Sequence, residues 1–137
     1  MKIQPIEAFM TKSPQCIQAN ATVIDAWRLM KSSGTRHLPV LDGDKLVGIV
    51  SERGLYRLET VANIDRAGDP VRDAMTAAYS VERGAPLDEV VEEMARCKVG
   101  AAIVLDGPRV IGIFTTTDAL QALAAVLSPP AETFAAC

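Results

Sequence analysis

The sequence has few of the residues that catalysis, metal binding and nucleic-acid binding use. Its 137 residues include one histidine, and aromatic side chains make up 4%. A lone histidine without a placed nucleophile or paired carboxylates leaves no catalytic arrangement, and no cysteines and histidines have metal-ligand spacing. The net charge is −3, and no run of Lys or Arg is interleaved with aromatics. We therefore expect no enzyme, no metal site and no nucleic-acid partner.

The cysteine count and the hydropathy pattern indicate the compartment. The three cysteines, Cys16, Cys97 and Cys137, are odd in number, which favours free thiols in a reducing compartment over a disulfide framework. No apolar run is long enough to span a membrane, and the N-terminus lacks a signal-peptide pattern. Because 49% of the residues are hydrophobic, the chain can bury a core without disulfides or metals. We expect a cytoplasmic protein with no membrane contact.

Caps and periodicity predict the elements of the first half. Residues 1–11 form a lead-in whose apolar spacing is typical of a short helical turn. A helix begins at Thr22, where the hydroxyl and the Asp25 carboxyl form a capping-box pattern, and it ends at Gly34. Asp-Gly-Asp at 42–44 joins two apolar runs, which predicts a β-hairpin.

The hairpin leads into a second predicted helix, which Ser51 opens. We expect three of its side chains to face the core: Leu55, Leu58 and Val61. Residues 63–70 follow as a linker. Residues 128–137 contain two adjacent prolines, which cannot continue a helix, and we expect them to form a flexible tail.

The second half of the chain repeats this order. Met94 follows Met30 by 64 positions (94 − 30). The same offset relates Val40 to Val104, Asp42 to Asp106, Gly43 to Gly107, Gly48 to Gly112 and Ser51 to Thr115. A unit of this size exposes an apolar sheet face that it cannot bury alone. We therefore predict an α+β fold of two β-α-β-β-α repeats, residues 1–66 and 67–127, packed through their sheets as a pseudo-twofold pair.

The stretch VIGIFTTTDAL, residues 110–120, is the strongest candidate for a binding site. It indicates a buried strand that leads into a helix whose first turn carries Thr115 and Asp118. A helix N-terminus presents free N–H groups and a positive dipole end, so these side chains suit either a helix cap or a polyol and phosphate site. From this stretch alone, both readings stay open.

The repeat and its motifs resemble a tandem pair of CBS domains, also called a Bateman module. The motifs that carry the resemblance are FMT at 9–11, TVIDA at 22–26, GTRHLPVLD at 34–42 and GIVSER at 48–53. The resemblance covers residues 6–127. It implies two clefts between the repeats, in which members of the family bind adenine nucleotides or other adenosyl ligands.

The resemblance also implies that only one cleft is competent. In the family motif Gly-h-x-(Ser/Thr)-x-x-Asp, the Asp contacts the ribose hydroxyls and the Ser or Thr lies near the phosphate. Residues 112–118 match this motif in full, whereas Gly54 occupies the Asp position of the first repeat. The crossed arrangement of the family implies further lining residues from the opposite repeat. The nucleotide-binding set is then Asp118, Thr115, Ile113, Thr11, Cys16, Thr35, Arg36 and His37, and the weaker second cleft has Ser51, Thr76, Ser80, Val99 and Gly100.

Alternative roles exist for two of these candidate residues. His37 fits a surface or hydrogen-bonded role as well as ligand contact, and Asp118 fits a cap. Trp27 lies on the apolar face of its helix and fits a core or dimer contact.

The predicted function is a non-enzymatic regulatory module that binds an adenine nucleotide, needs no cofactor and signals to a separate target protein. The alternative is a ligand-independent dimerisation module with vestigial clefts. In either case the resemblance implies a homodimer, with contact faces from the helices at 22–33 and 86–97.

Overall fold

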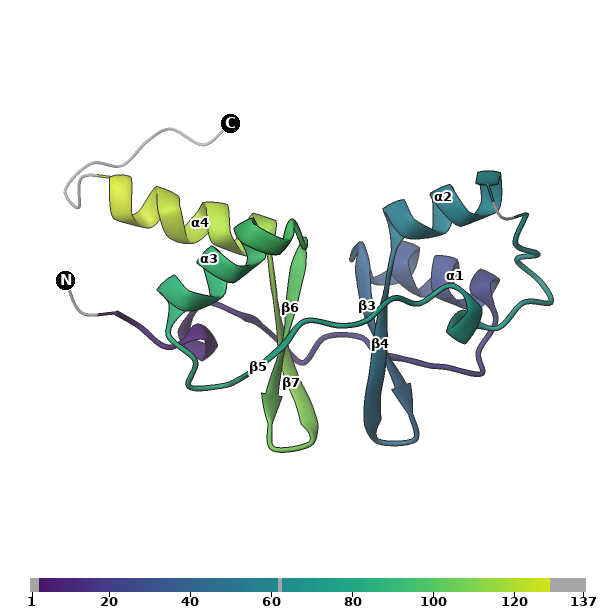
Figure 1. The fold of residues 1–137 in the computed structure, drawn as a ribbon, viewed down its shortest axis with the longest axis horizontal. Helices are drawn as coiled ribbons and strands as arrows, with labels where there is room; N and C mark the ends of the chain where they lie inside the picture. The colour runs from purple at the N-terminus through teal and green to yellow at the C-terminus, as the bar shows by residue number, and fades with distance from the viewer. Residues whose placement is uncertain (1–2, 62, 129–137) are drawn as a thin grey trace.

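The computed structural model describes residues 3–61 and 63–128, which form two repeats around two sheets (Figure 1). The first repeat contains β2 (Ile17–Gln18), α1 (Val23–Ser33), β3 (His37–Asp42), β4 (Lys45–Ser51) and α2 (Glu52–Val61). The second contains β5 (Ser80–Glu82), α3 (Leu87–Cys97), β6 (Ala101–Asp106), β7 (Arg109–Thr115) and α4 (Thr116–Leu127). The predicted α+β fold of two β-α-β-β-α repeats is confirmed.

The local signals in the sequence form the expected turns and caps. Thr22 and Asp25 make a complete capping box at the start of α1, and Gly34 ends that helix in the left-handed conformation at φ 70°. Gly43 and Gly107, at φ 64° and 60°, close the β3–β4 and β6–β7 hairpins. Left-handed backbone of this kind favours glycine, because glycine has no Cβ to clash.

The segments that precede each repeat pack onto the other repeat. The lead-in forms η1 (Ile6–Ala8) and β1 (Thr11–Lys12), and β1 pairs antiparallel with β7. Ile6 is fully buried in the core of the second repeat, and Figure 1 shows this purple segment beside α3. In the reverse direction, η2 (Val71–Asp73) carries Val71 into the core of the first repeat. The lead-in thus belongs with the second repeat in space, although it precedes the first in sequence.

The two sheets meet between the repeats. One has the strand order β1-β7-β6-β5 and the other β2-β3-β4. Ala101, Ile103 and Ile113 form a buried cluster there, with Leu46 and Ile49 of β4 packed against it. Because both repeats cover this cluster, neither buries its sheet face alone.

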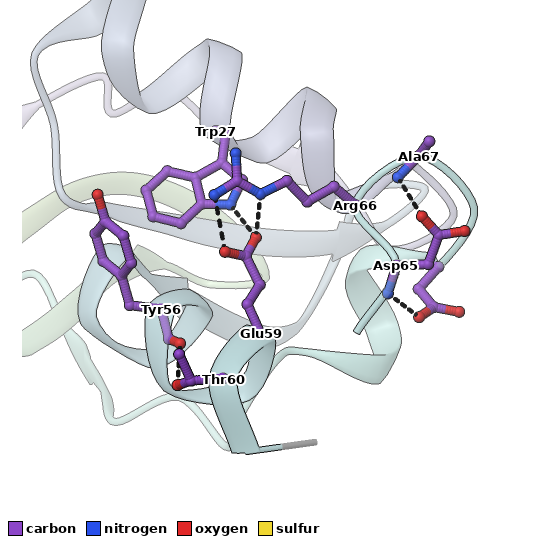
Figure 2. A network of polar contacts seen from close by, with 8 residues as sticks. Trp27, Tyr56, Glu59, Thr60, Asp65, Arg66 and Ala67 are labelled. Carbon is purple, nitrogen blue, oxygen red and sulfur yellow. Dashed lines mark hydrogen bonds and ion pairs between the residues drawn. The ribbon is translucent and has the colours of Figure 1, made fainter. Parts of the chain in front are cut away.

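A polar network fixes the linker onto the first repeat (Figure 2). The Trp27 indole N–H donates to Oε1 of Glu59 at 2.7 Å, and the Arg66 guanidinium donates to both Glu59 oxygens at 2.6 and 2.9 Å. The guanidinium also lies 5.1 Å from the centre of the Trp27 ring, and Tyr56 meets that ring edge-on. The network therefore joins α1, α2 and the linker.

Two expectations from the sequence need comment. Leu55 is buried and Leu58 half-buried as predicted, but Val61 is 81% exposed, because it is the last residue of α2 and lies outside the packed core. The predicted flexible tail lies outside the described residues, except for Ser128. In the part of the chain that the structure describes, no helix is both long enough and apolar enough to cross a bilayer.

Candidate functional site

The carboxylate of Asp118 lies at the start of α4, beside the lead-in strand β1. Its Oδ2 accepts hydrogen bonds from the amide and the hydroxyl of Thr115, at 2.9 and 3.2 Å. The Thr11 hydroxyl donates to Oδ1 at 3.2 Å and more weakly to Oδ2 at 3.4 Å. Thr115 and Asp118 therefore form the helix cap that was one of the two interpretations of this stretch, and the lead-in supplies one further donor to the carboxylate.

The sheet register explains why Thr11 reaches this carboxylate. Thr11 lies opposite Ile113 in the β1–β7 pair, two residues before Thr115 along β7. Because side chains two positions apart on a strand share a face, Thr11 faces the start of α4. Thr11, Ile113, Thr115 and Asp118, which the sequence predicted to act together, are thus neighbours.

The corresponding cleft of the first repeat contains a small cavity of about 180 Å³. Ser51 caps α2 by accepting the amide of Gly54 at 3.0 Å, and no carboxylate follows it there. Four of the five residues predicted for this cleft line the cavity: Ser51, Thr76, Val99 and Gly100. Ser80 does not line it, because it lies on β5, where it pairs with Ile103 and is exposed.

His37 lies in this second cleft, whereas the resemblance had assigned it to the Asp118 cleft. Its ring lines the cavity together with Ser51, its cross-strand partner in the β3–β4 register. Directly opposed residues of two strands place their side chains on one face, which explains the position. Burial, and secondarily the positive charge of Arg36, lower the pKa of His37, so the ring is neutral near neutral pH.

The remaining predicted residues lie near the clefts in different ways. Thr35 is half-buried, and its hydroxyl donates to the carbonyl of His37 at 3.1 Å. Arg36 is exposed and lines a wider groove between the repeats. Cys16 is half-buried, and burial raises the pKa of its thiol, so it is a weak nucleophile.

Sequence reasoning missed some of the residues that line the second cavity. Tyr79 and Ala101 are the clearest cases, alongside Ile49 and Ala77. The repeat offers a signal for two of them, because Ile49 and Ala101 match Ile113 and His37 of the predicted set at the 64-residue offset.

The groove that Arg36 lines is much larger, at about 1420 Å³, and runs along the helical side of both repeats. Leu87 and Val91 of α3 and Leu120 and Leu123 of α4 contribute apolar walls. None of the residues of α4 is buried, and Leu120 and Leu123 are 65% and 51% exposed. The helix that carries Asp118 therefore also presents an apolar surface.

Tandem β-α-β-β-α repeats with exchanged lead-ins define a class of regulatory module, the CBS domain pair. The family comparison agrees, because the CBS domain model matches this chain twice, at residues 6–59 and 71–125. The chain belongs to the CBS domain family.

Several relatives share most of this chain. The uncharacterized protein YlbB of Bacillus subtilis is 34% identical over 116 residues, which cover 82% of this chain and 78% of YlbB. A solved structure of an uncharacterized conserved protein from Pyrococcus horikoshii has a TM-score of 0.81 at 27% identity, covering 98% of this chain and 100% of that one. The CBS domain of a bacterial CNNM/CorC family Mg²⁺ transporter, solved in complex with ATP, has a TM-score of 0.75 at 25% identity, covering 86% and 85%.

The match extends over only part of some relatives. Two archaeal proteins align over 43% and 34% of their own length.

Proposed function

We propose that this protein is a regulatory module that binds an adenine nucleotide at Asp118 and signals to a separate target protein. The observation that carries the proposal is the Asp118 carboxylate at the start of α4, which accepts hydrogen bonds from the hydroxyls of Thr11 in the lead-in and Thr115. A carboxylate accepts hydrogen bonds from both hydroxyls of a ribose, and the positive end of a helix dipole favours a phosphate.

The residues that line the cavity of the second cleft support the assignment of Thr35 and Arg36 to the Asp118 site, because the two repeats are equivalent. Shifted by the repeat offset of 64 or 65 positions, six of these cavity residues correspond to predicted members of the Asp118 set, including Ile49, which corresponds to Ile113, and Ala101, which corresponds to His37. Thr76 corresponds to Thr11, Val99 to Thr35, Gly100 to Arg36, and Ser51 to Thr115. On this basis we place Thr35 and the forked donors of Arg36 at the wall of the Asp118 cleft, where the guanidinium suits a phosphate.

The ligand class is an adenosyl compound such as AMP, ADP or ATP, acting as a regulatory ligand and not as a cofactor. The CNNM/CorC relative bound to ATP supports this class. Asp118 and Thr115 supply contacts for the sugar and phosphate, and selection among these nucleotides depends on how many phosphates the cleft accepts.

A calorimetric titration with AMP, ADP and ATP tests the proposal. We expect saturable binding by the wild type and at least about tenfold weaker binding by Asp118→Asn, since a charged acceptor is replaced by a neutral one. The asparagine retains an oxygen for the helix cap, so thermal unfolding serves as the folding control. Binding of equal strength by both proteins would remove Asp118 from the site.

We also propose that the module is a homodimer. The exposed apolar residues of α4, with Leu87 and Val91 of α3, supply one continuous groove wall. The groove also carries charges of both signs, including Arg53 and Glu52, which can pair with their opposites when the surface contacts its own copy about a twofold axis.

The dimer surface also supports a second candidate function, a ligand-independent dimerisation module with vestigial clefts. Self-association without any thermal shift across the nucleotide panel would favour it over nucleotide sensing. A nucleotide can act as a signal only if it binds two arrangements of the protein with different affinity. For the sensing function, binding must therefore change the dimer or the contact with the target protein. Free thiols at Cys16 and Cys97 support a cytoplasmic location.

A further inference from the structure

The hydrogen bonds of Asp118 leave few positions for a ligand. A carboxylate has about four acceptor positions, two on each oxygen. Thr115 supplies both donors that reach Oδ2 at short range, its amide at 2.9 Å and its hydroxyl at 3.2 Å. The Thr11 hydroxyl, at 3.2 Å, uses one position on Oδ1. Among the described residues 3–61 and 63–128, nothing else donates to Oδ1, which leaves one acceptor position on it for a ligand.

A vicinal diol and a single hydroxyl differ in what they need from this carboxylate. A single hydroxyl fits the one free position and leaves Thr11 in place. A diol brings two donors, and the second requires the position that Thr11 holds, because Thr115 keeps Oδ2 as part of the α4 cap. The diol thus gains two bonds and breaks one.

We propose that Thr11 is a specificity-determining residue whose hydroxyl competes with a vicinal diol for Asp118, which lowers the preference of the site for ribose over 2′-deoxyribose. The inference rests on the proposed function and concerns the same cleft. Since Thr11 comes from the lead-in, the competition also couples ligand binding to the contact of β1 with α4.

The exchange is feasible because Thr11 can lose this bond without unfolding the lead-in. The main chain holds β1 independently, through its pairing with Gly112 and Ile113 and through the Ser13 amide bonded to the carbonyl of Ile111 at 3.0 Å. The Thr11 side chain is exposed, so water replaces the lost partner. The cost of displacement is therefore small compared with that of an unsatisfied buried group.

Thr11→Val tests the competition with a matched pair of ligands. Valine keeps the shape and the β-branched strand preference of threonine and removes the hydroxyl. We expect the variant to bind AMP about three- to tenfold more tightly than the wild type does, because no bond is broken on binding. The affinity for 2′-deoxy-AMP, which offers only the 3′-hydroxyl, should stay within about twofold, and Thr11→Ser should retain the wild-type affinities for both.

Four outcomes would overturn the inference. Weaker AMP binding by Thr11→Val would make the hydroxyl a direct ligand contact. Equal tightening for both nucleotides would assign the effect to packing and not to the diol. If the wild type binds neither nucleotide, the proposed function fails and the inference fails with it, whereas binding that depends on Asp118 but not on Thr11 overturns the inference alone.

Discussion

Gly54 is the residue that most clearly separates the two clefts. Ser51 and Gly54 align with Thr115 and Asp118 of the second repeat. In both repeats the hydroxyl of the first residue of the pair caps the helix that follows. The first repeat therefore keeps the cap geometry and lacks the carboxylate. This difference was readable in the sequence, since it depends only on aligning the two repeats.

Gly54→Asp should restore the missing carboxylate and add a second nucleotide-binding event in calorimetry. Gly54→Ala is the matched control, because both variants place a Cβ about as close as 3.0 Å to the Ser51 hydroxyl. Relative to alanine, the aspartate should raise the free energy of unfolding by about 0.5–1 kcal/mol, since it completes a capping box at the positive end of α2. A more stable variant that still binds one nucleotide would show that the carboxylate alone does not make a site.

His37 should make stability depend on pH in the range below neutrality. Burial lowers its pKa in the folded protein, so the unfolded chain binds the proton more readily. The free energy of unfolding should therefore rise with pH between the lowered folded pKa and the unfolded value of about 6.5, and fall as the pH decreases through that range.

His37→Gln should flatten this slope while it leaves the acid unfolding below about pH 4.5, where carboxylates titrate, unchanged. Denaturant unfolding at a series of pH values measures both regions. An unchanged slope between pH 5 and 7 would show that the imidazole is as solvated in the folded chain as in the unfolded one.

At the scale of elements, residue patterns predicted what is decided locally, whereas the exchange of the lead-in was implied only by the family resemblance. The capping box of Thr22 and the hairpin glycines are decided within a few residues, so pattern reasoning located them. The destination of the lead-in depends on the pairing of β1 with β7, about 100 residues apart in sequence, and no local pattern specifies it. For the same reason, local patterns did not predict which cleft His37 lines, since that depends on the register between β3 and β4.

Glu59 should contribute more to stability than an exposed ion pair, because it joins three segments (Figure 2). Its side chain is 14% exposed, and its ion pair with Arg66 lowers the pKa of the carboxyl. Glu59→Ala leaves the Trp27 indole N–H without its partner, and we expect a loss of about 1–2 kcal/mol in denaturant unfolding.

Glu93 supplies the control for that prediction. It pairs with Arg96 one helical turn away, and the Arg96 side chain is 71% exposed. Pairs of this kind contribute little to stability, so Glu93→Ala should leave the unfolding midpoint nearly unchanged. Equal effects of the two substitutions would mean that the hydrogen bond from Trp27 to Glu59 does not contribute to the free energy of unfolding.

At the scale of the whole molecule, the apolar groove is lined by α3, one of the two helices that the sequence indicated, and by α4, which the sequence did not indicate. The resemblance assigned dimer contacts to the helices at 22–33 and 86–97. In the structure α1 buries Val23, Ala26 and Met30 within its own repeat, whereas α4 has no buried residue. Amphipathic spacing identifies an apolar face but does not show what covers it. Only the three-dimensional structure shows that the apolar face of α1 is covered and that of α4 is exposed.

The dimer should therefore depend on α4. Leu123 is 51% exposed and lines the groove, so Leu123→Glu places a charge in the proposed contact without disturbing a buried core. We expect the wild type to sediment as a dimer at micromolar concentration and the variant as a monomer with similar thermal unfolding, because burying an unpaired carboxylate on association is costly. Val61→Glu is the control, since Val61 is 81% exposed and lies outside the groove. If both variants remain dimeric, the contact lies on another face, and the apolar surface of α4 must instead be assigned to the target protein.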